Sequence, residues 1–364
     1  MGIRKINSYL RSLNIIPEFI DLLSVVDYIK SKSDKKDYLL ITIDTNLYMY
    51  KYLRAEKQDI NTNVIILFKK QINKLIKNKI IPIYIFDSAP DELKKDIIDN
   101  RYNKRKKVIE QIIDLHNTNP DYMDKNELSE YNNKMHRLNL QSTYVSSNDI
   151  KKLKSLFNKS NIPYAIAPEQ ADVVCAKLVQ YDIADACLSE DMDILVSGSK
   201  FLIKYYKGRY LLYDRNLILE KLGITHEQLC KFSILLGSDY SRSVNNKILP
   251  NDLLEICKKY NFDFEKILND IVNIEVHRKY FQESRNNYIS LSLSDIVKNV
   301  CTDREYDHND IIKKMTKHYD LAFQLINLYN TNDYNINEFF NIINFYNYNI
   351  NDDLNITFYN IVNL

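Results

Sequence analysis

The sequence predicts an α/β fold in which a central, mostly parallel sheet is flanked by helices. Two apolar runs, at residues 38–44 and 80–87, each end in an aspartate, and residues 64–76 between them show helical apolar spacing. This strand–helix–strand order indicates parallel strands joined by a right-handed crossover. Further strands are expected at 162–167 and 183–188. The carboxyl ends of such strands share one edge, where open α/β sheets place their ligands.

The remaining elements are mostly helical. The apolar spacing predicts helices over 3–23, 94–137 (broken at Pro120) and 151–159. Pro168 suits the first turn of the helix that follows the third strand.

After the fourth predicted strand, the sequence predicts a hairpin and then further helices. Residues 200–206 and 209–214 read as a hairpin that turns at Lys207-Gly208, and helical spacing resumes at Leu217. The end of the chain, residues 327–364, is dense in Asn, Tyr, Phe and Ile and fits either a packed helical end or a poorly ordered tail.

Composition limits the compartment and the partners. At 364 residues the chain can form one large core or two domains, and 50 Lys+Arg against 48 Asp+Glu leave a net charge of only +2. A basic surface must therefore be local. The five cysteines form no CxxC pair, which favours reduced thiols. With no apolar run of membrane-spanning length and no signal-peptide pattern, we expect an intracellular protein.

The chain is organised around a stretch of three carboxylates, Glu190-Asp191-Met192-Asp193, between two apolar runs. Carboxylates this close to a core repel one another unless a cation lies between them. On spacing alone, a metal site and a merely acidic turn remain equal alternatives.

Other acids lie where predicted elements begin or end: Asp44 and Asp87 end the first two strands, and Glu169 and Asp172 open the helix after the third. Asp239 follows a predicted helix. A single aspartate there is commonly a helix cap, but this explains several converging segments poorly. Oxygen ligands without histidine favour Mg²⁺ or Mn²⁺ over zinc. Two such ions, roughly 3.5–4 Å apart, suit in-line attack on a phosphodiester.

With these residues the chain resembles the flap endonuclease/XPG family of structure-specific 5′ nucleases. The resemblance covers about residues 1–260 and lies in six segments that follow the order of the family: Met1-Gly2-Ile3, Ile43-Asp44-Thr45, Ile85-Phe86-Asp87, Ala167-Pro168, Glu190-Asp191-Met192-Asp193 and Leu235-Leu236-Gly237-Ser238-Asp239-Tyr240. It implies a PIN-like 5′-nuclease fold with a helical arch. It also implies two-metal hydrolysis of DNA at 5′ flaps or nicks, in replication, repair or recombination.

The resemblance also implies roles for individual residues. The first metal would be held by Asp44, Asp87, Glu169 and Asp172, and the second by Asp191, Asp193 and Asp239. Lys94 and Arg101, seven and fourteen residues after Asp87, match the basic pair that steadies the scissile phosphate. Tyr50 matches an aromatic that stacks on a base, and Gly2 also falls at a substrate-binding position. Between Lys94 and Lys107 there are seven Lys/Arg against two Asp, which suits a single-stranded 5′ end.

The chain departs from the family in two places. The segment that usually reads Ser-Glu-Ala-Glu is Glu169-Gln170-Ala171-Asp172 here, so that either Glu169 reaches the metal or the first site lacks one charge. After Tyr240 the glycines of a helix–two-turn–helix element are missing. Asn245 or Asn246 would have to supply the positive φ of that loop, which leaves the duplex grip and its K⁺ site open.

The resemblance divides the chain into an N-terminal nuclease region (1–110), a helical arch or linker (111–145), an internal nuclease region with a degenerate helix–two-turn–helix element (146–260) and a helical extension (261–364). We expect a monomer that binds DNA with a 5′ flap, nick or branch, in the nucleus or at a cytoplasmic replication site. Residues 333–340 keep the hydrophobic part of a sliding-clamp motif but lack its glutamine, which disfavours clamp binding. The AT-biased composition would suit a large DNA virus or an AT-rich microbe.

Two other functions remain open. A PIN-type ribonuclease is an alternative of the same chemistry, but the long region after Lys94 and the segment 235–240 disfavour it. A catalytically weakened protein that binds branched DNA is the second, because Gln170 replaces an acid and the loop glycines are missing.

Overall fold

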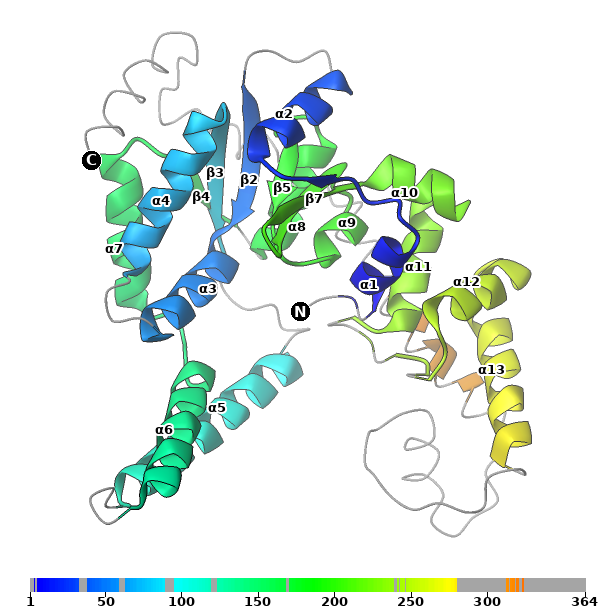
Figure 1. The fold of residues 1–364 in the computed structure, drawn as a ribbon. Coiled ribbons are helices and arrows are strands. Elements are labelled where there is room, and N and C mark those ends of the chain that lie inside the picture. Colours follow the sequence, from blue (N-terminus) through cyan, green and yellow to red (C-terminus); the bar gives the residue numbers. More distant parts are fainter. Residues whose placement is uncertain are drawn as a thin grey trace. The chain divides into compact units, whose positions relative to one another are not determined.

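The computed structural model in Figure 1 describes residues 3, 5–32, 38–58, 63–88, 95–118, 123–167, 170–238, 241, 243–245 and 247–279, with a few positions between 312 and 323. The chain forms two compact units. The sheet unit consists of Phe19–Ser189 with Tyr334–Leu364, and the hairpin unit consists of Met1–Glu18 with Glu190–Asp333.

The sheet unit contains four parallel strands in the order β5-β2-β3-β4. These are β2 (Leu39–Asp44), β3 (Ile80–Phe86), β4 (Tyr164–Ile166) and β5 (Ala186–Leu188). β2 pairs with both β3 and β5, so the crossover predicted from the first two strands is confirmed. The α/β class with a mostly parallel sheet is therefore confirmed as well.

Helices cover both faces of this sheet. Adjacent residues in the register of parallel strands share a face, so Thr42 and Ile83 face one way and Ile43 and Tyr84 the other. On the first face the Thr42 hydroxyl donates to the carbonyl of Cys175 in α8 (Ala171–Gln180), at 3.3 Å.

On the second face the Tyr84 hydroxyl donates to Gln71 Oε1 at 2.9 Å, in α4 (Val64–Lys77). The Tyr84 ring stacks on Phe157 of α7 (Ser147–Lys159), with centroids 4.4 Å apart. Phe68, Phe86 and Tyr164 also have ring centroids within 6.0 Å of Phe157. This aromatic cluster forms part of the core on that face.

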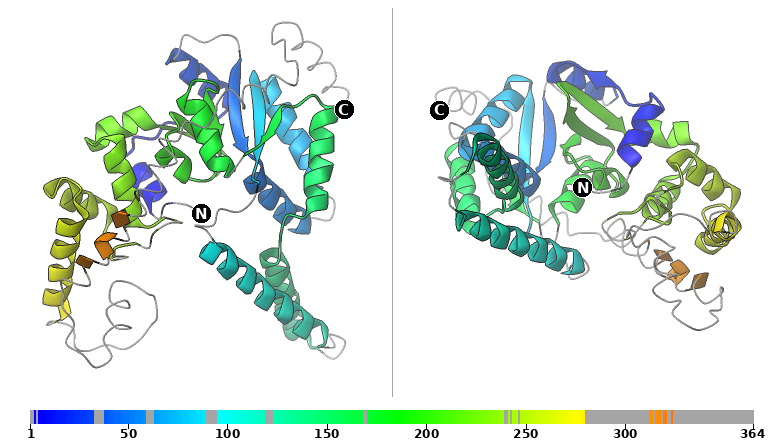
Figure 2. Two further views of the ribbon diagram at one scale, coloured as in Figure 1. Left: turned by 180° about the vertical axis from the view of Figure 1, so that it is seen from behind. Right: turned by 60° about the horizontal axis from the view of Figure 1, so that its bottom comes forward.

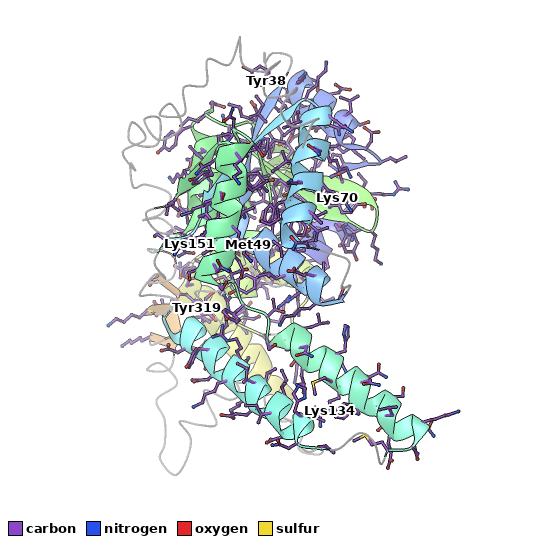
Figure 3. All side chains as sticks on the ribbon, turned by 90° about the vertical axis from the view of Figure 1, so that its left-hand side faces the viewer. Tyr38, Met49, Lys70, Lys134, Lys151 and Tyr319 are labelled. Carbon is purple, nitrogen blue, oxygen red and sulfur yellow. The ribbon has the colours of Figure 1, made fainter. Side chains whose placement is uncertain are left out.

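Two helices extend from the sheet unit as a pair, α5 (Lys95–His116) and α6 (Lys125–Gln141) (Figures 1 and 2). Asp124 caps α6 in a capping box with Glu127. The expected helical stretch with a break is therefore confirmed as two helices, and Pro120 lies outside the described residues. Figure 3 shows Lys134 on this pair, away from Tyr38 at the start of β2.

Lys57, at the end of α3 (Thr45–Gln58), joins α3 to the last turn of α6. Its ammonium group donates to the Asn139 carbonyl at 2.9 Å and to Ser142 Oγ at 3.2 Å. A cation at a helix C-terminus satisfies its carbonyls and opposes the helix dipole. Partial burial of the ammonium group lowers the pKa of Lys57.

Replacing Lys57 with Met is expected to loosen the end of α6. A partly exposed contact of this kind contributes about 0.5–1 kcal/mol, so amide exchange over residues 138–142 should become roughly two- to fivefold faster. Hydrogen exchange followed by mass spectrometry measures this. Arg54→Met, at an exposed position of the same helix, is the control. Unchanged exchange in the Lys57 variant would show that the contact does not hold the pair.

The hairpin unit is built around an antiparallel hairpin and a set of helices. β6 (Phe201–Tyr206) pairs with β7 (Arg209–Asp214) around Lys207-Gly208, which confirms the predicted hairpin. The helices described in this unit include α1 (Ile6–Ser12), α9 (Asp193–Val196), α10 (Arg215–Leu222), α11 (His226–Leu236), α12 (Pro250–Lys259) and α13 (Phe264–Lys279).

Two helix boundaries differ from the sequence-based prediction. Residues 3–23 do not form one helix: α1 ends at Ser12, β1 (Glu18–Phe19) follows, and α2 (Leu22–Ser31) begins behind the Asp21 cap. Asn14 has φ 52°, and Pro17 cannot donate to a helix. The helix expected to open at Pro168 begins at Ala171, with Gln170 at its N-cap.

Gly237 ends α11 with φ 99°, a conformation that L side chains rarely adopt. A Cβ atom at this position would lie 2.7 Å from the backbone nitrogen of Ser243. The motif Leu235–Tyr240 therefore needs its glycine for a close backbone approach.

Gly237→Ala is expected to destabilise the protein more than Gly208→Ala. Both substitutions place a side chain at positive φ, which costs about 1–3 kcal/mol, but a Cβ at Gly208 meets nothing within 4 Å. Thermal unfolding compares the two variants. Equal melting temperatures would contradict the proposed role of the close contact.

Within the described residues, the helices include none that is long and apolar enough to span a membrane. The thiols of Cys175, Cys187, Cys230 and Cys257 are buried.

Candidate active site

In the sheet unit, Asp87 brings together segments that follow three different strands. Its Oδ1 accepts a hydrogen bond from the backbone nitrogen of Ala171, and its Oδ2 accepts one from Asn46 Nδ2, both at 2.7 Å. Asp87 comes directly after β3, Asn46 lies two residues beyond the end of β2, and Ala171 begins α8 after β4. The carboxyl ends of these strands therefore form one polar edge, as expected for parallel strands.

Asp44 and Asp172 lie at the same edge. Asp44 is the last residue of β2 and accepts from the Leu47 nitrogen at 3.2 Å. Asp172 lies in the first turn of α8 and accepts from the Val173 nitrogen at 2.8 Å. Burial is the main cause that raises the pKa of Cys175, and the charges of Cys187, Asp44 and Asp172 raise it further. Asp44 and Asp172 thus act on the same buried thiol from two elements.

Sequence reasoning missed Asn46. Asparagine near a helix start reads as a local cap, and no spacing rule connects it with an aspartate 41 positions away. The available signal was an asparagine two residues after Asp44, the acid at the end of a predicted strand. In the structure this amide holds one oxygen of Asp87 and so orients its carboxylate.

In the hairpin unit, Glu190 and Asp191 lie in a short loop, and Asp193 is the first residue of α9. The Asp193 nitrogen donates to Asp191 Oδ1 at 3.1 Å, and Asp193 is only 8% exposed. The Lys204 ammonium group donates to the Glu190 carbonyl at 2.6 Å. We call residues 190–193 the acid loop.

The other predicted site residues are placed as follows. Tyr50 is a partly exposed residue of α3, and Arg101 is an exposed residue of α5. Gly2, Lys94, Glu169 and Asp239 lie outside the described residues. Across the part of the chain that the structure describes, no group of three His, Cys, Asp or Glu side chains is arranged to hold a metal ion. The ligand roles of the aspartates therefore stay predictions.

The chemistry of the described side chains nevertheless fits a hard cation. Asp44, Asp87 and Asp172 offer carboxylate oxygens, and Asn46 is an amide that already supports one of them. Oxygen donors of this kind suit Mg²⁺ or Mn²⁺. In the acid loop Asp191 and Asp193 offer the same donor type.

The structure describes Gln170 and Asn245, which lie in the two segments that depart from the expected family pattern. Gln170 stands at the N-cap of α8, without a side-chain cap, and is 8% exposed. Asn245 does not adopt positive φ; its side chain instead accepts from the Lys247 nitrogen at 2.8 Å. Of the two asparagines that could supply the positive φ, Asn245 does not, because its side chain closes a local turn instead. Asn246 lies outside the described residues.

Comparison with known proteins identifies two family regions. The XPG N-terminal domain matches residues 1–108, and the XPG I-region matches residues 161–239. Together these matches span more than half of the chain. They include Asp44, Asp87 and the acid loop.

Two relatives are flap endonucleases. The chain is 28% identical over 337 residues to flap endonuclease 1 of Plasmodium falciparum, covering 83% of this chain and 48% of the relative. It is 30% identical over 235 residues to flap endonuclease 1 of Enterocytozoon bieneusi (strain H348), covering 60% of this chain and 62% of the relative. The chain thus spans about half to three fifths of the length of these relatives.

Among solved structures, the catalytic core of Rad2 in complex with DNA substrate has a similar fold. The TM-score is 0.55 at 21% identity, over 88% of this chain and 86% of that chain. This likeness agrees with the parallel strands and flanking helices of the sheet unit described above. From its two matching regions and its relatives, the chain belongs to the flap endonuclease/XPG family.

Proposed function

We propose that this protein is a metal-dependent, structure-specific 5′ nuclease that cuts DNA at 5′ flaps or nicks. The observation that carries the proposal is the polar edge, where Asp87 accepts hydrogen bonds from Asn46 and from the start of α8. Asp44 and Asp172 stand at the same edge. Family membership and the similarity to flap endonuclease 1 proteins support the choice of a phosphodiester in DNA.

The proposed cofactor is Mg²⁺, with Mn²⁺ as a substitute. Asp44, Asp87, Asp172 and Glu169 would hold one ion, and Asp191, Asp193 and Asp239 a second. When bound, such ions supply a water nucleophile and stabilise charge on the phosphate. The protein orients these acids: Asn46 and the Ala171 amide fix Asp87, and the Asp193 amide fixes Asp191.

The proposed DNA contacts come from α5 and its surroundings. Arg101 and Lys94 would contact the scissile phosphate, and Tyr50 and Gly2 would contact the nucleotide beside it. The α5 helix also exposes Tyr102, with Arg105 lying 5.8 Å from the ring centroid. Cations beside aromatic rings suit single-stranded DNA, because phosphates give affinity and bases stack.

Cleavage of a 5′-flap duplex in Mg²⁺ tests the proposal. Asp191→Ala should lower the rate by more than about 100-fold, beyond the 10–100-fold typical of residues that only support a ligand. Glu220→Ala, an exposed acid of α10, is the control and should cut like the parent protein. Equal cleavage by parent and Asp191→Ala protein would refute the assigned site, and cleavage of RNA alone would favour a PIN-type ribonuclease.

Gln170 favours a second function, a protein that binds branched DNA but cuts it weakly. At the N-cap of α8 it places a neutral amide in a segment where the family carries an acid. Normal binding of the flap substrate without cleavage in Mg²⁺ or Mn²⁺ would support this alternative.

The cellular location, the oligomeric state and clamp binding belong to the same proposal. We propose that the protein acts as an intracellular monomer, in a nucleus or at a cytoplasmic site of DNA replication. The sliding-clamp segment 333–340 lies outside the described residues. Co-elution with a clamp in size-exclusion chromatography tests whether it binds.

A further inference from the structure

Lys204 is a buried cation to which the proposed nuclease reaction assigns no role. It lies on β6 in the hairpin unit and is only 7% exposed. A buried ammonium group is costly unless it is hydrogen-bonded and electrically compensated. Burial lowers the pKa of Lys204, and the negative charges of Glu190 and Asp191 act against that lowering. Its compensation therefore comes from the acid loop.

The contact of Lys204 is with the backbone of that loop. Its Nζ atom donates to the Glu190 carbonyl at 2.6 Å. Holding this carbonyl restrains the peptide plane between Glu190 and Asp191, and with it the position of the Asp191 Cα atom. The Asp193 amide then holds Asp191 Oδ1 at 3.1 Å. The acid loop is thus held from both ends.

We propose that Lys204 is a positioning residue, which holds the acid loop in its working conformation before any cation binds. Three carboxylates within four positions repel one another, and a positive charge bonded to the loop backbone offsets part of that repulsion. The inference rests on the proposed function, because the loop is taken to supply Asp191 and Asp193 to the reaction. Lys204 does not contact the substrate.

Hydrogen exchange of the full-length protein in EDTA tests the positioning role apart from cleavage. Lys204→Met removes the donor and the charge while keeping an unbranched side chain. Amide exchange over 189–194 should become at least about tenfold faster, because a hydrogen bond from a charged group is lost, with little change over 226–236 of α11. Lys204→Arg should stay closer to the parent protein. Lys221→Met, at an exposed position of α10, is the matched control.

Kinetics on the 5′-flap substrate give the second readout. A positioning residue predicts that kcat falls in Lys204→Met while the KM for DNA stays within about twofold. Parent-like loop exchange in a folded Lys204→Met protein would overturn the proposal. Faster exchange spread equally over the whole hairpin unit would also overturn it, because the role would then be general stability. If the parent protein does not cleave, the proposed function fails, and the exchange result alone decides the role of Lys204.

Discussion

Replacing Asp87 with Asn is expected to lower kcat on a 5′-flap substrate by more than about 100-fold while leaving the protein folded. Both carboxylate oxygens of Asp87 accept hydrogen bonds, from Asn46 Nδ2 and from the Ala171 amide. The amide group of Asn can face only one of these two donors with its oxygen, and it carries no charge for a cation. Single-turnover cleavage in Mg²⁺ measures the loss.

Asn46→Ala tests the hydrogen bond that orients Asp87 separately from the proposed role of Asp87 as a metal ligand. It leaves the Asp87 charge and the Ala171 contact intact and removes a single donor. Residues of this supporting kind typically contribute about 10–100-fold, so its loss should be smaller than that of Asp87→Asn. Raising the Mg²⁺ concentration should restore part of the Asn46→Ala activity but not the Asp87→Asn activity. The opposite order of the two losses would mean that Asp87 is a structural cap and no ligand.

The strands were predictable because their signals are local. β2 and β3 are continuous apolar runs with an aspartate at or just after their ends, and the turn at Lys207-Gly208 marks the hairpin. Parallel pairing then follows from the intervening helix, so the edge that carries Asp44 and Asp87 could be placed from the sequence. The boundaries of α1 and α8 could not, because they depend on Asn14 adopting positive φ and on where the chain leaves β4.

The residues that orient these acids, Asn46 and Lys204, could not be predicted from the sequence, for a different reason. Asn46 and Lys204 act through contacts across 41 and 14 positions, and neither belongs to a pattern of its own. Lys204 is moreover a charged residue in a largely apolar strand, between Ile203 and Tyr205. Its meaning depends on the acid loop that its ammonium group reaches. The positions of the strand-end carboxylates were thus predictable from the sequence, whereas the groups that orient them were not.

Phe157→Ala is expected to cause the largest loss of stability. Phe157 is fully buried in the sheet unit and touches four other aromatic rings, of Phe68, Tyr84, Phe86 and Tyr164. Truncating such a ring costs about 3–5 kcal/mol, because the transfer free energy is lost and a cavity remains. With a urea slope of about 3 kcal/mol/M, the unfolding midpoint should fall by roughly 1–1.7 M. Far-UV circular dichroism in urea measures the shift.

Two further variants show whether the cavity is the cause. Lys152→Ala, on the exposed face of the same helix, should leave the midpoint within about 0.2 M of the parent value, because exposed substitutions rarely exceed 0.5 kcal/mol. Phe157→Leu keeps most of the volume and should lie between the two. The polar edge begins where β2 and β3 end, so the alanine variant should also lose cleavage at temperatures that the parent tolerates. A Phe157→Ala midpoint equal to that of Lys152→Ala would show that the aromatic cluster does not hold α7 to the sheet.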